Sequence, residues 1–166
     1  MSVTTSDNRA DWDKFIRGLQ SLSTGPRAAV AGVQQGTTTG DGLDVAEYAL
    51  TNEMGAVIKR TGKHGPVRPI VIPSRPFMRM YFDNNLAKIE RFSENAITQA
   101  MLGRVSTRAA FTAIGLYTQT GIKRQIRKSE DFTPNAPSTI EAKGSERPLI
   151  DHAILLSNIS FELRRD

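Results

Sequence analysis

Apolar residues recur at three- and four-residue steps in five parts of this chain, with polar residues at the intervening positions. That spacing places the apolar side chains on one face of an α-helix. Asp44 lies at a possible helix start, and Gly55 and Gly103 lie at possible helix ends. The helices predicted in this way are Ala10–Leu22, Asp44–Gly55, Phe77–Tyr81, a helix capped by Asp83 or Asn84 that runs to Leu102, and Val105–Lys128 as the longest.

Shorter apolar runs predict three strands, over residues 27–34, 68–72 and 155–163. Pro69 in the second run favours the edge of a sheet, because proline cannot donate a backbone hydrogen bond. The basic, glycine-rich segment 56–66 is predicted to be a loop or a hairpin tip.

Strands that are distant in the sequence and separated by helices indicate an α+β fold. We expect a small mixed or antiparallel β-sheet packed by two to three helices in a single domain, residues 1–166. Residues 1–8 are polar and are predicted to be a flexible N-terminus. Residues 130–150 contain several prolines and a glycine, which predicts an extended arm without regular structure.

The composition changes this picture in two ways. Only 39% of the 166 residues are hydrophobic and the mean hydropathy is −0.35, so the core is expected to be thin and assembly with other chains is favoured. There are no cysteines, which excludes disulfides, thiolate chemistry and cysteine zinc sites.

Without a long apolar run or a signal-like start, the chain is predicted to be soluble, made in the cytoplasm and not associated with a membrane.

The formal charge of +5 is unevenly distributed. No acidic residue occurs between Glu53 and Asp83 or between Glu94 and Glu130, and these two stretches hold twelve of the 22 basic residues. Basic side chains on one surface would bind the nucleic acid backbone without reading its sequence. Solvated faces and salt bridges between subunits explain the same pattern, and the sequence leaves both interpretations open.

The sequence contains no arrangement of residues typical of catalysis. His64 lies in a predicted surface turn, and the Asp151-His152 pair has no accompanying nucleophile motif. The loop 36–42 resembles a phosphate-binding loop only in its glycine content, because the Gly-Lys-Ser/Thr ending is missing. No metal-ligand spacing is present either. We therefore predict that the protein is not an enzyme and that it binds no cofactor or metal.

Three segments, in order, resemble a known family: Val45–Ala56, Ile72–Arg79 and Pro134–Asp151. Their succession is similar to the neck and tail-completion proteins of tailed bacteriophages, of the tail-component or virion-morphogenesis type. The resemblance covers roughly residues 44–163. One departure is His152-Ala153, where the family has Thr-Gly, so the turn there cannot use a left-handed glycine and a helical turn is the alternative.

The resemblance implies a structural virion protein of the phage neck or tail end. It implies a homo-oligomeric ring, with six copies favoured and twelve possible, that joins the head–tail connector to the tail terminator or tube proteins. Genomic DNA would pass through the lumen of this ring, and assembly would take place in the cytoplasm of the bacterial host. The alternative is a basic, sequence-nonspecific DNA-binding protein.

Candidate site residues follow from the same comparison. In Ile72–Phe77 two prolines are expected to form a rigid strand-to-helix corner, with Phe77 packed and Arg75 projecting outward. Residues 134–140 are expected to be a stiff arm across the next subunit or, alternatively, a plain surface loop. The candidates for the lumen or a partner surface are Lys59, Arg60, Lys63 and Arg68, and those for the subunit interface are Arg75, Phe77, Pro134, Asn135, Pro137 and Ile140.

Overall fold

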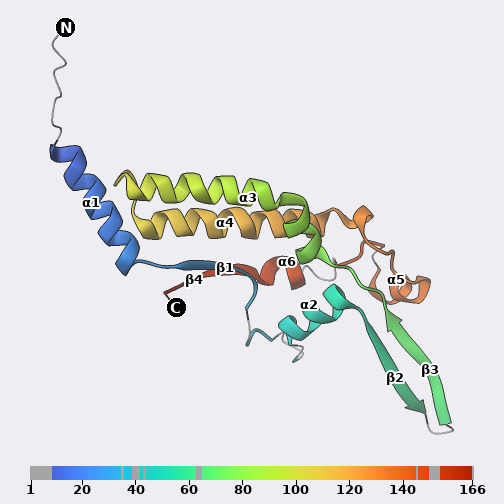
Figure 1. Ribbon diagram of the computed structural model, residues 1–166. Helices are drawn as coiled ribbons and strands as arrows, with labels where there is room; N and C mark the ends of the chain where they lie inside the picture. The colour runs from blue at the N-terminus through green and yellow to red at the C-terminus, as the bar shows by residue number, and fades with distance from the viewer. Residues whose placement is uncertain are drawn as a thin grey trace. The chain divides into compact units, whose positions relative to one another are not determined.

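The computed structural model of the chain describes residues 9–34, 36–38, 42, 44–62, 65–144, 146–149 and 154–165. Within these residues the fold is α+β, as predicted, with six α-helices and two small antiparallel sheets of two strands each (Figure 1). The sequence predicted one sheet, whereas the structure has two separate sheets. The elements are α1 (Arg9–Thr24), β1 (Ala28–Val33), α2 (Val45–Met54), β2 (Ala56–Gly62), β3 (Gly65–Ile72), α3 (Phe77–Met101), α4 (Thr107–Arg127), a 3-10 turn (Ser129–Asp131), α5 (Pro137–Lys143), α6 (Ile154–Asn158) and β4 (Ile159–Arg164). β1 pairs with β4, and β2 pairs with β3.

The chain divides into two compact units. The first contains the described parts of Met1–Val30, Leu86–Thr118 and Glu162–Asp166. In this unit α3 and α4 run side by side (Figure 1), and the hydroxyls of Ser21 and Thr107 are 2.7 Å apart, which joins α1 to the start of α4. Thr107 is 2% exposed and Ser21 is half-buried, so this polar contact is partly shielded from water.

The second unit contains the described parts of Ala31–Asn85 and Gln119–Phe161. Its core consists of side chains that are completely buried, and these come from α2, α3, α4, α6 and β4: Val45, Phe77, Ile122, Ile126, Leu155 and Ile159. Gly121 of α4 is essential to this packing, because a Cβ atom there would overlap the ring of Tyr81. The absence of a side chain at Gly121 therefore lets α3 approach α4 closely.

Helix α2 has the ends that the sequence predicted. The Asp44 carboxylate accepts hydrogen bonds from the backbone N–H groups of Ala46 (2.8 Å) and Glu47 (3.3 Å), which is the usual cap of a helix N-terminus. Gly55 ends the helix at a φ of 76°, and its N–H donates to the carbonyl of Thr51. A glycine is needed at this position, because the left-handed region disfavours side chains.

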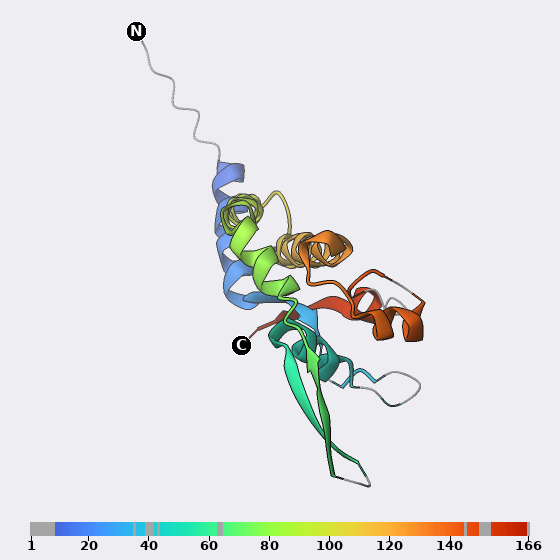
Figure 2. The same ribbon diagram turned by 90° about the vertical axis from the view of Figure 1, so that its right-hand side faces the viewer.

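β2 and β3 form a hairpin that extends away from α2 (Figure 2). The segment 56–66 was predicted to be a loop or hairpin tip, and most of it is strand. In the register Val57 is opposite Val71 and Ile58 is opposite Ile70, followed by an irregularity before Arg60. Since the sheet has only two strands, Pro69 does lie on an edge strand, as its residue type predicted.

Four predictions about secondary structure were wrong. α3 continues from Phe77 to Met101 without a new cap at Asp83 or Asn84, because no proline or glycine interrupts it and Tyr81 packs as a helical residue. α3 is also longer than α4, with 25 residues against 21. The predicted strand 155–163 starts with helix α6: Leu155 and Ile159 are buried while Ser157 is exposed, and a strand would place these three residues on one face.

The region predicted to be an irregular arm contains helix α5, which is the fourth error. Pro137 occupies the first turn of α5, where a missing N–H and a fixed φ are tolerated. Gly144 ends the helix at a φ of 64°, with its N–H bonded to the carbonyl of Ile140. The same proline and glycine that suggested a lack of regular structure therefore mark the two ends of a short helix.

Candidate functional site

The segment from Ile72 to Phe77 forms a strand-to-helix corner that is tied to the end of α2. The backbone N–H of Arg75 donates to the carbonyl of Asn52 at 2.7 Å, and the Ser74 hydroxyl donates to the carbonyl of Glu53 at 2.8 Å. Asn52 is itself 5% exposed and donates from its side chain to the carbonyl of Tyr48. The corner is thus held by backbone and side-chain bonds in addition to its prolines, as its sequence suggested.

The Glu53 carboxylate caps the start of α3. Its two oxygens accept hydrogen bonds from the backbone N–H groups of Met78 and Arg79, each at 3.0 Å. Both N–H groups belong to the first turn of the helix and have no partner within it. A negative charge is also favourable at the positive end of the helix dipole.

We expect the Glu53→Ala substitution to lower the free energy of unfolding by about 1 kcal/mol, because two helix N–H groups lose their acceptors. Urea denaturation of both proteins measures the difference. Glu47→Ala is the matched control, since Glu47 is an exposed acid in the first turn of α2, where Asp44 and not Glu47 caps the helix. If Glu47→Ala lowers the free energy of unfolding as much as Glu53→Ala does, the Glu53 carboxylate does not stabilise the start of α3.

The side chain of Arg75 lies in the interior of the second unit. Its Nε donates to the carbonyl of Thr133 at 2.9 Å, and its Nη2 donates to the carbonyl of Pro134 at 3.3 Å and to Oδ1 of Asn135 at 3.0 Å. The residue is only 7% exposed. The expectation that Arg75 projects from the corner is wrong, because three oxygen acceptors of residues 133–135 draw the guanidinium inward.

Burial lowers the pKa of the Arg75 guanidinium, and the nearby Tyr48 opposes that effect. The acceptors of its hydrogen bonds are neutral oxygens, and no carboxylate of the described residues pairs with it. A buried cation that lacks an anionic partner is costly to desolvate. The cost is reduced here by the geometry of the guanidinium, which places several donors in one plane.

The six candidate interface residues divide into two groups. Phe77 is completely buried and Arg75 nearly so, and both therefore serve the packing of their own chain. Asn135 is held on both sides, since it accepts from Arg75 and its Nδ2 donates to the carbonyl of Arg147 at 3.3 Å. The candidates with accessible surface are Pro134, Pro137 and, in part, Ile140.

A cavity of about 380 Å³ lies within the second unit. Ile70 and Ile72 of β3 form part of its wall, Thr139 of α5 forms another part, and Arg75 and Leu149 also line it. Leu149 is 4% exposed and has a φ of 62°, which is rare for a residue other than glycine. Sequence reasoning did not find this cavity, because its wall comes from segments that are far apart in the chain.

The β2–β3 hairpin carries an unusual amount of exposed apolar surface. Val57 is 62% exposed and Val71 66%, and they pair across the strands. Ile58 and Ile70, the next pair, are 45% and 44% exposed. Because successive residues of a strand point to opposite faces, both faces of the hairpin present an apolar pair to solvent.

The basic candidates lie further along the same hairpin. Lys59 of β2 and Arg68 of β3 are exposed. For Arg60 the structure describes the backbone alone, and Lys63 lies outside the described residues. The hairpin therefore combines an apolar part near α2 with exposed positive charge beyond it.

The second acid-free stretch includes the turn between α3 and α4. Arg104 and Arg108 are exposed there, and Arg104 donates to the side chain of Gln99 at 3.2 Å. In the same unit the rings of Phe92 and Tyr117 are stacked, with centroids 4.4 Å apart. The aromatic faces that meet in this pair are not available to a nucleic acid base.

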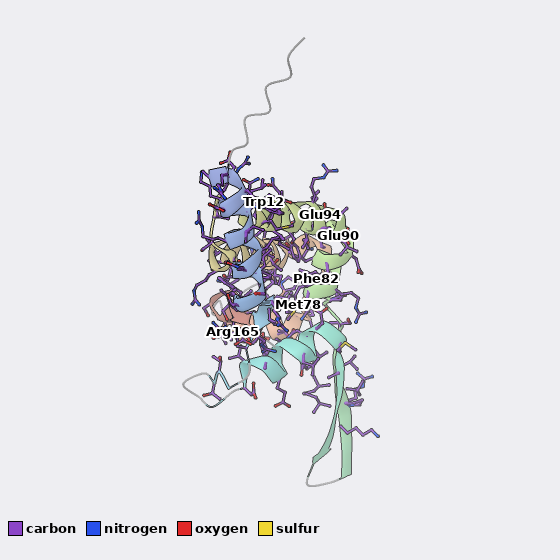
Figure 3. The ribbon with its side chains drawn as sticks, turned by 60° about the vertical axis from the view of Figure 1, so that its left-hand side comes forward. Trp12, Met78, Phe82, Glu90, Glu94 and Arg165 are labelled. Atoms are coloured by element: carbon purple, nitrogen blue, oxygen red, sulfur yellow. The ribbon has the colours of Figure 1, made fainter. Side chains whose placement is uncertain are left out.

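Basic residues on α3 are interspersed with acids. Lys88 and Arg91 line a second cavity of about 390 Å³, together with Phe92. Glu90 and Glu94 come from the same helix (Figure 3). The described part of α3 thus offers a mixed charge pattern, which is a poor match for a nucleic acid backbone.

The two histidines and the departure from the family pattern cannot be placed, because His64 and Asp151–Ala153 lie outside the described residues. Among the residues that are described, no group of three or more His, Asp or Glu side chains could hold a metal ion. No helix in this part of the chain is long and apolar enough to cross a membrane.

Comparison of the chain with protein families, with curated proteins and with solved structures gives no match. The function that fits this protein best must therefore be inferred from the geometry of its own side chains and from the residue patterns described above.

Proposed function

We propose that this protein is a structural component of the neck or tail end of a tailed bacteriophage. It forms a homo-oligomeric ring, with six copies favoured, that connects the head–tail connector to the tail terminator or tube, and genomic DNA passes through the ring. Two lines of support are independent of each other. One is the resemblance of the segments 45–56, 72–79 and 134–151, and the other is the surface of the β2–β3 hairpin.

The observation that carries the proposal is the pair of apolar faces on this hairpin. An isolated two-stranded hairpin is only marginally stable in water, and this one exposes Val57 and Val71 on one face and Ile58 and Ile70 on the other. Contiguous exposed apolar surface of this kind is typical of a protein–protein interface. A hairpin inserted between neighbouring subunits would bury both faces at once.

A closed ring requires a head-to-tail contact, in which one surface of a subunit meets a different surface of the next. The hairpin supplies the first surface. The exposed residues Pro134 and Pro137 belong to the same unit and supply a candidate for the second. Because Arg75 ties residues 133–135 to the corner that follows β3, the two surfaces are held by one bonded network.

The double substitution Val57→Thr with Val71→Thr tests the interface. Threonine preserves the branched shape and the strand propensity of valine but adds a hydroxyl that must lose water on association. We expect the dissociation constant between subunits to rise on the order of a hundredfold, with little change in the stability of the monomer. Native mass spectrometry over a range of concentrations measures the assembly.

Leu86→Ala with Leu116→Ala is the matched control, since these leucines are 55% and 50% exposed on helices of the other unit. The control should assemble like the wild type. A wild-type protein that remains monomeric with its head and tail partners present, and that is missing from virions, would exclude the ring.

The second candidate function is sequence-nonspecific DNA binding by the free protein. Exposed Lys59 and Arg68 on the hairpin favour it, together with the net charge of +5. It requires the monomer to bind short duplex DNA with an affinity that falls steeply with salt. A fluorescence anisotropy titration at low and moderate salt decides the point, because the ring proposal expects weak binding by the monomer.

A further inference from the structure

The cavity of about 380 Å³ in the second unit contains an unused set of hydrogen-bond donors. Its volume is within the range of ordinary ligand pockets. The wall is largely apolar, with Ile70, Ile72 and Leu149 among its residues, while Arg75 and Tyr48 supply polar groups. No acidic residue occurs among the described residues that line it.

Arg75 uses only part of its donor capacity within the chain. The bonds to residues 133–135 come from Nε and Nη2, and Nη1 has no acceptor among the described residues. No side-chain nitrogen or oxygen in this part of the chain is fully enclosed without a partner, so Nη1 remains reachable from the cavity that Arg75 lines. An N–H group of Nη1 can therefore donate to one oxygen of a carboxylate.

Tyr48 adds a second donor to the same cavity. Its phenol is half-buried, and its hydroxyl makes no hydrogen bond with another described residue. An anion bound at this point would meet the Arg75 guanidinium and a neutral hydroxyl, and it would offset the cost of burying Arg75.

We propose that this cavity is a binding site for a carboxylate carried on a short branched apolar group. The carboxylate accepts hydrogen bonds from Nη1 of Arg75 and from the Tyr48 hydroxyl, and the apolar group packs against Ile70, Ile72 and Leu149. The inference does not rest on the assembly function, because it follows from donors and apolar walls within one unit. A free small acid and an acidic side chain beside a leucine in another protein share this chemistry.

Titration of the full-length protein with 4-methylpentanoate tests the site, with 4-methylpentanamide as the uncharged ligand of the same shape. NMR of isoleucine and leucine methyl groups detects binding at Ile70, Ile72 and Leu149. We expect saturable shifts of these methyl groups with the acid and at least about tenfold weaker binding of the amide, since a charged hydrogen bond is lost. Equal binding of both ligands, or of neither, would overturn the proposal.

Two substitutions locate the ligand while leaving Arg75 in place. Tyr48→Phe removes only the hydroxyl and should weaken acid binding about fivefold. Thr139→Leu fills the cavity from α5, where leucine is also the better helix former, and should abolish binding in a folded protein. Unchanged affinity in both variants would place the ligand elsewhere and refute the site.

Asp151 follows the cavity residue Leu149 closely in the sequence and lies outside the described residues. If Asp151→Asn binds the acid and the wild type does not, the chain supplies its own carboxylate and the external ligand is excluded. The capped peptide acetyl-Val-Glu-Leu-amide, compared with its Gln counterpart, separates the two sources. Tighter binding of the Glu peptide than of the free acid assigns the site to a protein segment, and the reverse assigns it to a small molecule.

Discussion

Replacement of Arg75 by alanine is expected to lower the free energy of unfolding by about 3 kcal/mol. The substitution removes the donors of three hydrogen bonds and leaves the oxygens of Thr133, Pro134 and Asn135 without these partners. It also enlarges the cavity that Arg75 lines, with a loss of contacts for a side chain that is 7% exposed. Urea denaturation followed by circular dichroism gives the difference from the wild type.

Arg79→Ala is the control for this prediction. Arg79 lies four residues further along and is exposed, and the contact of its guanidinium is with the sulfur of Met54 at 3.5 Å. Its loss should cost less than about 0.5 kcal/mol. Arg75→Lys keeps the positive charge but loses the planar fork, so it should fall between the two. If Arg75→Ala and Arg79→Ala are equally stable, Arg75 does not hold residues 133–135.

The second large effect is expected at Gly121. The Gly121→Ala substitution should lower the free energy of unfolding by about 2 kcal/mol, because the new Cβ overlaps the ring of Tyr81, which is 5% exposed. Alanine is the better helix former, which offsets the loss by about 1 kcal/mol, and that gain is already included in the estimate. Thermal and urea denaturation both measure the change.

A neighbouring position and a compensating substitution separate the steric effect from helix propensity. Thr120 is exposed and precedes Gly121 in α4, so Thr120→Ala should be neutral or slightly stabilising. Combining Gly121→Ala with Tyr81→Leu should cost less than the sum of the single changes, because the smaller side chain makes room for the methyl group. Additive costs would mean that the two residues are not in steric conflict.

The two effects have a shared consequence for the proposed ring. Arg75 secures residues 133–135, and Gly121 permits the approach of Tyr81 to α4; both contacts lie within the second unit. That unit also carries the β2–β3 hairpin and the exposed Pro134 and Pro137. We therefore expect Arg75→Ala to reduce assembly as well as stability, whereas Val57→Thr with Val71→Thr should affect assembly alone.

Local signals in the sequence were sufficient wherever a few neighbouring residues determine the structure. The limits of α2 were predicted, because Asp44 caps its first turn and Gly55 has a positive φ at its end. The α1 prediction, Ala10–Leu22, lies within the observed Arg9–Thr24, since a single apolar stripe defines the helix. The α+β class followed from the order of such segments.

Local signals along the chain gave wrong predictions where the same residue type is compatible with two kinds of secondary structure. Pro137 and Gly144 were interpreted as breaks in regular structure, yet they occupy the start and the end of α5. The alternating apolar residues of 155–163 suggested a strand throughout, but Ser157 is exposed between the buried Leu155 and Ile159, whereas a strand would place all three on one face. In each case contacts with the rest of the unit selected one of the two conformations.

By itself the sequence determined the fold class, the caps of α2, the proline-rich corner and the absence of cysteine chemistry. Only the tertiary structure decided the direction of Arg75, because its acceptors are 58 to 60 residues away along the chain. It also decided the exposure of Val57 and Val71, since pairing in a two-stranded hairpin leaves both faces without a covering layer. The direction of a side chain depends on partners that are distant in the sequence, and the pattern of apolar and polar residues along the chain does not identify those partners.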